Sequence, residues 1–271
     1  MKKIIIKPKI KISNSLDLKN LNLINKNLSL REIKNIKILY NNKEKKLEDL
    51  FTITEQTIKS DVNEVLLLES NFFYDFLGFE WSNDLLLINS NVGSYLGAKM
   101  KSGKITVKGS CQNYMGAEMS GGAIVVKKNA GNFVGSSISG KRIGMTGGSI
   151  LILGNVDKYL CYQMRRGFIF VGGEAGDNCC NNLVAGTIII KKGVGKNFCI
   201  GMKRGTVILL SNVTMQSNFI ESGNCSLAFI NLLNQFVSNE FKMKIFGEKS
   251  KVSRFIGDKN IRGQGELLKI I

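Results

Sequence analysis

The residue types that most often carry enzyme chemistry are scarce in this sequence. None of its 271 residues is histidine, which excludes Ser–His–Asp and Cys–His catalysis, histidine proton transfer and histidine metal ligands within this chain. The acidic residues are scattered, and no close carboxylate pair stands in a glycine-framed motif. We therefore expect no catalytic residue and no metal site in this chain.

Basic residues dominate the charge, with 38 Lys and Arg against 21 Asp and Glu and a net charge of +17. Six of them form pairs near predicted turns and are the candidate cofactor-binding residues: Lys141, Arg142, Arg165, Arg166, Lys203 and Arg204. Two interpretations stay open: ordinary solvated turns in a Lys-rich chain, or a basic track for a polyanion. No nucleic-acid recognition motif accompanies the charge, so specific nucleic-acid binding is not expected.

Three cysteines, Cys161, Cys180 and Cys199, recur every 19 residues. If that spacing stacks them, their Cα atoms lie about 5 Å apart, within reach of a disulfide or a shared soft metal. A ladder of small buried residues is the interpretation we favour, because an unpaired cysteine packs as a small hydrophobe.

The same 19-residue spacing defines an internal repeat. Residues 91–109 and 110–128 align without a gap, and the aligned pairs are Tyr95 with Tyr114, Gly97 with Gly116, Met100 with Met119, Gly103 with Gly122, Ile105 with Ile124 and Val107 with Val126. Four further copies follow, and the third of the six carries a seven-residue insertion. A more divergent copy precedes all six and begins at Phe76. Each copy has an alternating apolar strand preceded by a glycine, which suits a tight turn.

A 19-residue unit is too short for two helices and fits one coil of a β-helix. The sequence therefore predicts an all-β fold, a right-handed parallel β-helix (solenoid) of about seven 19-residue coils with small α/β flanking segments. The rival left-handed hexapeptide β-helix needs a six-residue period, which is not seen. The residues expected inside are Ile105, Ile124, Ile150, Ile169, Ile188 and Val207.

The repeat divides the chain into three predicted parts: an N-terminal mixed segment (1–75), the β-helix (76–211), and a C-terminal helix with short strands packing on the solenoid (212–271). The helix is expected at 226–241, where apolar residues have amphipathic spacing. The outward position of the coil strands is apolar in five of six copies: Thr106, Val125, Leu151, Phe170, Ile189 and Ile208. Such a stripe is normally covered, here by the C-terminal segment or by another protein chain.

The expected location is the cytoplasm. The longest apolar run at the start, Ile4–Ile6, is too short for a signal peptide or a membrane span, and no later stretch of 18 apolar residues lacks a charge. None of the six cysteines forms a C-x-x-C motif, and their number fits reduced cytosolic thiols. No membrane contact is expected.

The coil sequences GAEMSGGAIVVK, YQMRRGFIFVGG and GMKRGTVILL resemble the β-helical subunit of formylmethanofuran dehydrogenase and, more distantly, the C-terminal β-helix of the glutamate synthase large subunit. The flanking KNIKILYNNKEKKLEDLFTI, FIESG and RFIGDKNIRGQGELL look like the equivalent β-helical subunit of the bacterial formyltransferase/hydrolase complex. The resemblance covers nearly the whole chain. Two departures concern local packing: Cys161, Cys180 and Cys199 replace the usual coil glycine, and Asn178 and Asn197 replace the aromatic residue.

The resemblance implies a non-catalytic scaffold that binds formyltransferase and amidohydrolase-like hydrolase subunits in tetrahydromethanopterin-linked formaldehyde oxidation. It implies no cofactor bound tightly by this chain, but a methanofuran-type cofactor with a polyglutamate tail within the complex. The six basic residues are then candidates to guide that tail. Two alternatives remain: the β-helical subunit of a molybdenum or tungsten formylmethanofuran dehydrogenase, and a stand-alone polyanion-binding solenoid.

Overall fold

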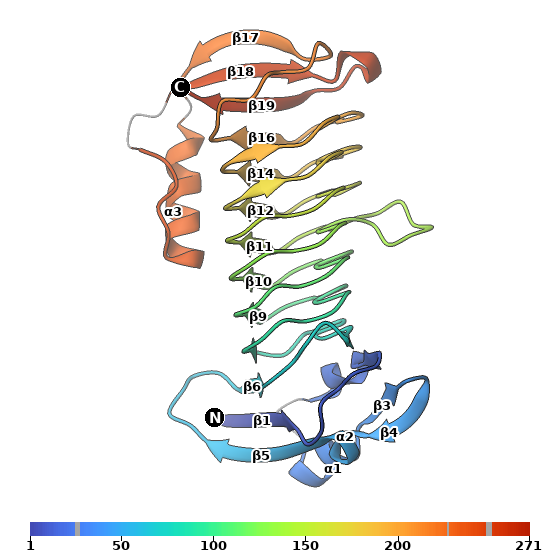
Figure 1. The fold of residues 1–271 in the computed structure, drawn as a ribbon. Helices are drawn as coiled ribbons and strands as arrows, with labels where there is room; N and C mark the ends of the chain where they lie inside the picture. The colour runs from blue at the N-terminus through green and yellow to red at the C-terminus, as the bar shows by residue number, and fades with distance from the viewer. Residues whose placement is uncertain (25–27, 227, 248–250) are drawn as a thin grey trace.

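The computed structural model describes residues 1–24, 28–226, 228–247 and 251–271. These residues form a largely β structure, in which strands are stacked one above another in a single column (Figure 1). The main sheet has 13 strands in the order β17-β18-β19-β16-β14-β12-β11-β10-β9-β8-β6-β1-β5. Sequence order and spatial order therefore coincide through most of the column.

The middle of the main sheet consists of parallel neighbours. Its strands are β6 (Glu64–Leu67), β8 (Leu85–Ile88), β9 (Lys104–Val107), β10 (Ala123–Val126), β11 (Ser149–Ile152), β12 (Phe168–Val171), β14 (Thr187–Ile190), β16 (Thr206–Leu209) and β19 (Gly265–Ile270). Strands β9 to β16 come from the six repeats and pair in the predicted register, with Ile105 beside Ile124 and Ile124 beside Ile150. Each repeat contributes one rung of this sheet.

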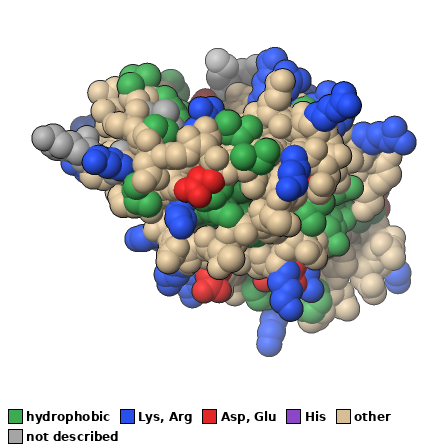
Figure 2. All heavy atoms as spheres, turned by 90° about the horizontal axis from the view of Figure 1, so that it is seen from above, with side chains coloured by type: hydrophobic (Ala, Val, Ile, Leu, Met, Phe, Trp, Pro, Cys, Tyr) green, Lys and Arg blue, Asp and Glu red, His purple; other side chains and the backbone are tan. Residues whose placement is uncertain are grey.

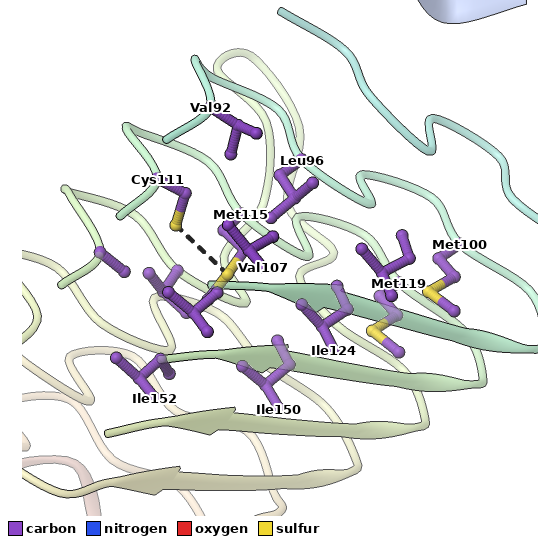
Figure 3. Packing of buried hydrophobic residues seen from close by; sticks show 14 of the residues in the cluster. Val92, Leu96, Met100, Val107, Cys111, Met115, Met119, Ile124, Ile150 and Ile152 are labelled. Carbon is purple, nitrogen blue, oxygen red and sulfur yellow. Dashed lines mark hydrogen bonds between the residues drawn. The ribbon is translucent and has the colours of Figure 1, made fainter. Parts of the chain in front are cut away.

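The inward side of the rungs forms the core, as the alternation predicts. The side chains of Ile105, Ile124, Ile150, Ile169, Ile188 and Val207 are all fully buried. Figure 3 shows Ile124 and Ile150 on successive strands, with Met100 and Met119 in a neighbouring row. The thiol of Cys111 donates a hydrogen bond to Sδ of Met115 at 3.4 Å inside the same core. Burial of these apolar rows is the main force that holds the stacked repeats together.

One turn within each repeat requires a left-handed backbone and a close approach to the next strand. Gly97 has φ +59°, and a Cβ atom there would lie 2.5 Å from Cδ1 of Ile124 on the next rung. Cys161, Cys180 and Cys199 occupy the equivalent turn in later coils with φ of 60°, 57° and 59°. The cysteines therefore change the side chain at this turn but keep its backbone conformation.

A second side of the column carries shorter backbone pairings, and the repeats also carry a row of stacked rings. The backbone bridges run Val92–Cys111–Ala130–Val156–Ala175 and continue into β13 (Glu174–Ala175) and β15 (Gly193–Val194). The rings of Phe76, Tyr95, Tyr114, Phe133 and Tyr159 stack nearly parallel, with neighbouring centroids 4.6–4.9 Å apart. All five residues have φ near 60°. Ring stacking thus accompanies a backbone conformation that is unfavourable for aromatic residues.

The N-terminal segment closes one end of the column. Strand β1 (Lys2–Pro8) pairs in parallel with β6, and β5 (Phe51–Thr57) pairs antiparallel with β1. A small sheet contains β4 (Lys43–Lys46), β3 (Lys37–Tyr40), β2 (Leu16–Asp17) and β7 (Tyr74–Asp75). The short helices here are η1 (Lys19–Leu23), α1 (Leu30–Lys34) and α2 (Leu47–Leu50). Ser29 and Glu32 form a capping box at the start of α1.

The C-terminal segment closes the other end and covers the outward stripe. Strands β17 (Ile220–Cys225) and β18 (Val252–Gly257) extend the sheet antiparallel beyond β19, with η2 (Lys259–Ile261) between β18 and β19. Helix α3 (Phe229–Phe241) lies alongside the column (Figure 1). Its Ile230 and Val237 join one buried cluster with Val125, Leu151 and Phe170. The chain's own C-terminal segment therefore covers this stripe; residue 227, inside the predicted helix range, lies outside the described residues.

The main sheet continues past residues 76–211 at both ends. Leu66 of β6 and Ile5 of β1 extend the outward row below Leu87, and Leu268 of β19 extends it beyond Ile208. Among the helices that the structure describes, none has the length and apolar character needed to cross a membrane. The six cysteines are all free thiols.

Candidate functional site

Immediately before each strand of the column the chain makes a turn, and we call these stacked turns the pre-strand corner. By strand register its rungs are residues 61–63, 82–84, 101–103, 120–122, 146–148, 165–167, 184–186, 203–205 and 263–265. The backbone N–H of Arg165 donates to the carbonyl of Met145 at 2.8 Å, and that of Lys203 to Leu183 at 2.8 Å. These rung-to-rung bonds fix the backbone from which the corner side chains project.

Four of the six predicted basic residues come together at this corner. Arg165 and Arg166 share one rung, and Lys203 and Arg204 share the rung two steps further along. Two rungs of a parallel sheet are about 10 Å apart. All four side chains are exposed, and within the described parts of the chain none of them forms an ion pair.

Lys141 and Arg142 lie on the inserted loop, 136–144, which falls between β10 and β11 in the sequence and projects from the column (Figure 1). The Nζ atom of Lys141 is 3.4 Å from Oε2 of Glu118, and the hydroxyl oxygens of Ser139 and Tyr114 are 3.0 Å apart. At the base of the loop the Gly144 N–H donates to the carbonyl of Gln163 at 3.0 Å, two residues before the corner rung that begins at Arg165. The charge of Lys141 is therefore partly neutralised, and the loop forms a separate basic element.

The corner also contains charges that the sequence reasoning did not single out. Lys101 precedes β9 in the position of Arg165 and Lys203, and its Nζ is 4.0 Å from Glu80. Asp61 and Asp84 occupy the first two rungs. The corner thus changes from acidic at its N-terminal end to basic in its C-terminal half. The 19-residue register could have identified Lys101, whereas the acidic rungs lie outside the clear repeats.

The chemistry available at the corner is binding of anions. Guanidinium and ammonium groups donate charge-assisted hydrogen bonds to carboxylates and phosphates. Exposed pairs of this kind contribute about 0–1 kcal/mol each, and salt weakens them. Figure 2, which views the C-terminal end of the column, shows basic side chains spread around the rim and few acidic ones.

The cysteine row is brought together, and Cys179 joins it. Cys161, Cys179, Cys180 and Cys199 are fully buried. Hydrogen bonds with Cys161, Cys179 and Cys199, together with burial, raise the pKa of Cys180 well above its usual range. Burial raises the pKa of Cys199 as well. Because the thiolate is the metal ligand and the nucleophile, Cys180 and Cys199 are suited to packing as neutral thiols. In the described parts of the chain, no group of three or more Cys, Asp or Glu residues is arranged to hold a metal ion.

The family model described as "GXGXG motif" matches residues 73–245, a range that includes all six repeats and α3. No curated protein matches this sequence.

Among solved structures, the chain is similar to a chain of the formyltransferase/hydrolase complex (FhcABCD) from Methylorubrum extorquens, crystallised in complex with methylofuran. The two chains are 27% identical, and the TM-score is 0.85. The alignment covers 98% of each chain. The similarity therefore includes both end segments as well as the coils.

Proposed function

The chain belongs to the GXGXG motif family, and we propose that it is a subunit of a formyltransferase/hydrolase complex. The observation that carries this proposal is the whole-chain similarity to a chain of such a complex, at a TM-score of 0.85 over 98% of both chains. The end segments are the most informative part of that match, because coils alone are common to unrelated solenoids. Similarity at both end segments supports similar contacts with partner subunits.

The fold that we infer for the repeats is a right-handed β-helix. The parallel rungs, the 19-residue register and the bridges on a second side support coils that return to the same place after each repeat. The right hand is the usual hand of a crossover between parallel strands. In the same proposal residues 1–75 and 212–271 act as end segments of a central β-helix of residues 76–211.

Within the complex we assign this chain a structural, non-catalytic role. The absence of histidine from the sequence supports this assignment, as does the raised pKa of the buried thiols of Cys111, Cys180 and Cys199. The proposed partners are the formyltransferase subunit and an amidohydrolase-like hydrolase subunit, which carry the chemistry of formaldehyde oxidation linked to tetrahydromethanopterin. The free thiols support a cytoplasmic location, where thiols stay reduced.

We further propose that the pre-strand corner guides the acidic tail of a methanofuran-type cofactor. The related complex was crystallised with methylofuran, and the exposed Arg165, Arg166, Lys203 and Arg204 form no ion pair within the described residues. A polyglutamate tail presents carboxylates along a flexible chain, which matches cations repeated along the column. Lys141 and Arg142 on the projecting loop would extend the basic surface.

The experiment that tests the subunit role is affinity purification of the tagged full-length chain from its own cells. Formyl transfer between a tetrahydromethanopterin carrier and a furan-type carrier, followed by formate release, should co-elute with the tag. Co-elution of a molybdenum or tungsten protein with formylmethanofuran oxidation would instead identify a dehydrogenase. Elution of the chain without either activity would overturn the proposal.

A further inference from the structure

The cover that α3 provides over the outward side of the main sheet ends at β10. In β10, β11 and β12 all four residues are buried, and Val125, Leu151 and Phe170 share one cluster with apolar residues of α3. In β6, β8 and β9 buried residues instead alternate with partly exposed ones. Figure 1 shows α3 alongside the C-terminal half of the column, ending before the level of β9. The outward side of the N-terminal half therefore lacks the cover of α3.

Four residues occupy the stripe position on this uncovered part, and we call Ile5, Leu66, Leu87 and Thr106 the open stripe. Ile5 pairs with Leu66, Leu66 with Leu87, and Leu87 with Thr106, on neighbouring parallel strands. All four are partly exposed, and Thr106 in turn pairs with Val125, where the covered part begins. Parallel sheets normally have both faces covered, and contiguous exposed apolar residues mark interaction sites. The open stripe therefore has the character of an interface.

Two unpaired cations flank Thr106 in the open stripe. Lys104 precedes it by two residues on the same side of β9, and Lys108 follows it by two. Within the described residues neither lysine forms an ion pair. Glu64, in the same row of the sheet as Lys104, is already paired with Lys3 at 2.9 Å. A partner that presents carboxylates here would meet cations that this chain leaves unpaired.

We propose that the open stripe binds an amphipathic helix of a partner subunit, whose apolar residues pack on Ile5, Leu66 and Leu87 and whose Asp or Glu residues face Lys104 and Lys108. The inference rests on the proposed function, because that function supplies the partner. The helix continues the cover that α3 provides over the rest of the stripe. Four rungs spaced about 4.8 Å apart span about 14 Å, which a helix of about ten residues matches. A second copy of this chain would bring the same unpaired lysines together and is a poorer occupant.

The apolar contact is tested by Leu87→Glu in the tagged full-length chain, purified from its own cells. The formyl-transfer and formate-releasing activities that co-purify with the tag should fall at least about tenfold, because the new charge is placed in the apolar contact. Leu87 is partly exposed, so the carboxylate stays hydrated in the free chain, and circular dichroism should remain native. The control is Leu232→Glu, the same change at a leucine of α3 that is 66% exposed. Retention of the activities by Leu87→Glu, or equal loss from both variants, would overturn the proposal.

The charge of the occupant is tested by Lys104→Glu combined with Lys108→Glu. This variant should lose the co-purifying activities by about tenfold, because the new carboxylates repel the acidic side of the partner helix. Lys191→Glu combined with Lys192→Glu changes the net charge equally after β14, away from the open stripe, and should retain them. High salt should weaken the wild-type association. Equal behaviour of the two double variants would overturn the acidic occupant.

The occupant itself is identified by a photoreactive p-benzoylphenylalanine in place of Leu66 in the full-length chain in its own cells. Irradiation should join this chain to a partner peptide with apolar residues three or four apart and acidic residues between them. An adduct between two copies of this chain, or no adduct, would overturn the inference. Failure of the subunit role is seen separately, since the wild-type chain would then elute without formyl transfer and formate release. Failure of this inference alone leaves those activities with the wild type and with every variant.

Discussion

The ring of Phe168 on β12 meets the ring of Phe236 on α3 edge to face, with centroids 5.2 Å apart and planes at 75°. Phe241, at the end of α3, also contacts Phe168, with the centroids 6.2 Å apart. Aromatic contacts thus attach the helix to β12, whose Phe168 lies in the same buried cluster as the stripe residue Phe170. A charge introduced into this part of the stripe consequently tests folding of the chain and not docking of a partner.

Phe170→Glu is expected to destabilise the isolated chain by about 3 kcal/mol or more, because the new carboxylate is buried without a partner. Phe170 is 2% exposed beneath α3. Leu232 lies on the same helix and is 66% exposed. Leu232→Glu is therefore the control and should change stability by less than about 0.5 kcal/mol. Urea unfolding measures both. Equal stability of the two variants would mean that α3 does not cover the stripe in solution.

Replacing Arg165, Arg166, Lys203 and Arg204 together by Ser is expected to raise the KM of the complex for a long-tailed furan cofactor by about tenfold at low salt. The physical reason is the loss of several weak charge pairs that act along one tail. The cofactor with a trimmed tail should show no change, and high salt should abolish the difference.

The matched control removes the same number of charges elsewhere. Lys127, Lys128, Lys191 and Lys192 follow strands β10 and β14 and are also exposed. Replacing these four by Ser changes the net charge equally but leaves the pre-strand corner intact. A similar rise in KM for both quadruple variants would show that net charge alone, and not the corner, attracts the tail.

Tyr114→Ala is expected to destabilise the column by about 2 kcal/mol, since Tyr114 stacks on Tyr95 and Phe133 with centroids 4.9 Å away on each side. Tyr114→Asn should cost about 1 kcal/mol less than Tyr114→Ala. Both variants lose the stacking contacts of the Tyr114 ring, but Asn tolerates the left-handed backbone at φ 62° better than Ala does. Asn178 and Asn197 already take this conformation in later coils. Thermal unfolding distinguishes the variants, and a larger loss for Asn than for Ala would refute the role of backbone conformation.

Stability is expected to fall as the pH rises from about 8.5 toward 12. Burial raises the pKa of Cys111 to about 12, and the pKa values of Cys180 and Cys199 are also raised. Unfolded thiols lose their protons near their ordinary pKa of about 8.5. The native state therefore binds more protons in this window, and the free energy of unfolding decreases with pH.

Urea midpoints measured across this pH window test the expectation. Cys111→Ala should make the decline shallower, because it removes a thiol whose pKa is raised by burial. Alanine fits this row, since Ala130 occupies the neighbouring bridge position. Cys225→Ser, at a half-buried site, is the control for the loss of a thiol as such. A decline of equal steepness in wild type and Cys111→Ala would contradict the assignment to buried thiols.

Much of the column could be predicted because one short unit repeats. Ile105 and its equivalents are buried as the alternation requires, and Arg165 and Lys203 share a corner because their spacing is twice the repeat. Strands β6 and β19 could not be predicted as rungs, since neither belongs to a recognisable copy of the repeat. Their places are set by tertiary pairing with β8 and β16.

The site was less predictable than the fold, for reasons of geometry. The spacing of Lys141 and Arg142 says nothing about the direction of an inserted loop, and the ion pair with Glu118 depends on that direction. The absence of an acceptor for the Trp81 N–H among the described residues depends on how the N-terminal segment closes the column. Neither feature has a local sequence signal.

The central claim is that this chain is a subunit of a formyltransferase/hydrolase complex, and native mass spectrometry of the tagged chain purified from its own cells tests it most directly. The account predicts assemblies whose masses are accounted for only by this chain together with both a formyltransferase and a hydrolase subunit. Collisional release should yield this chain as one component of those assemblies. Detection of the chain solely as a monomer or as copies of itself, from cells that contain both catalytic subunits, would contradict the account.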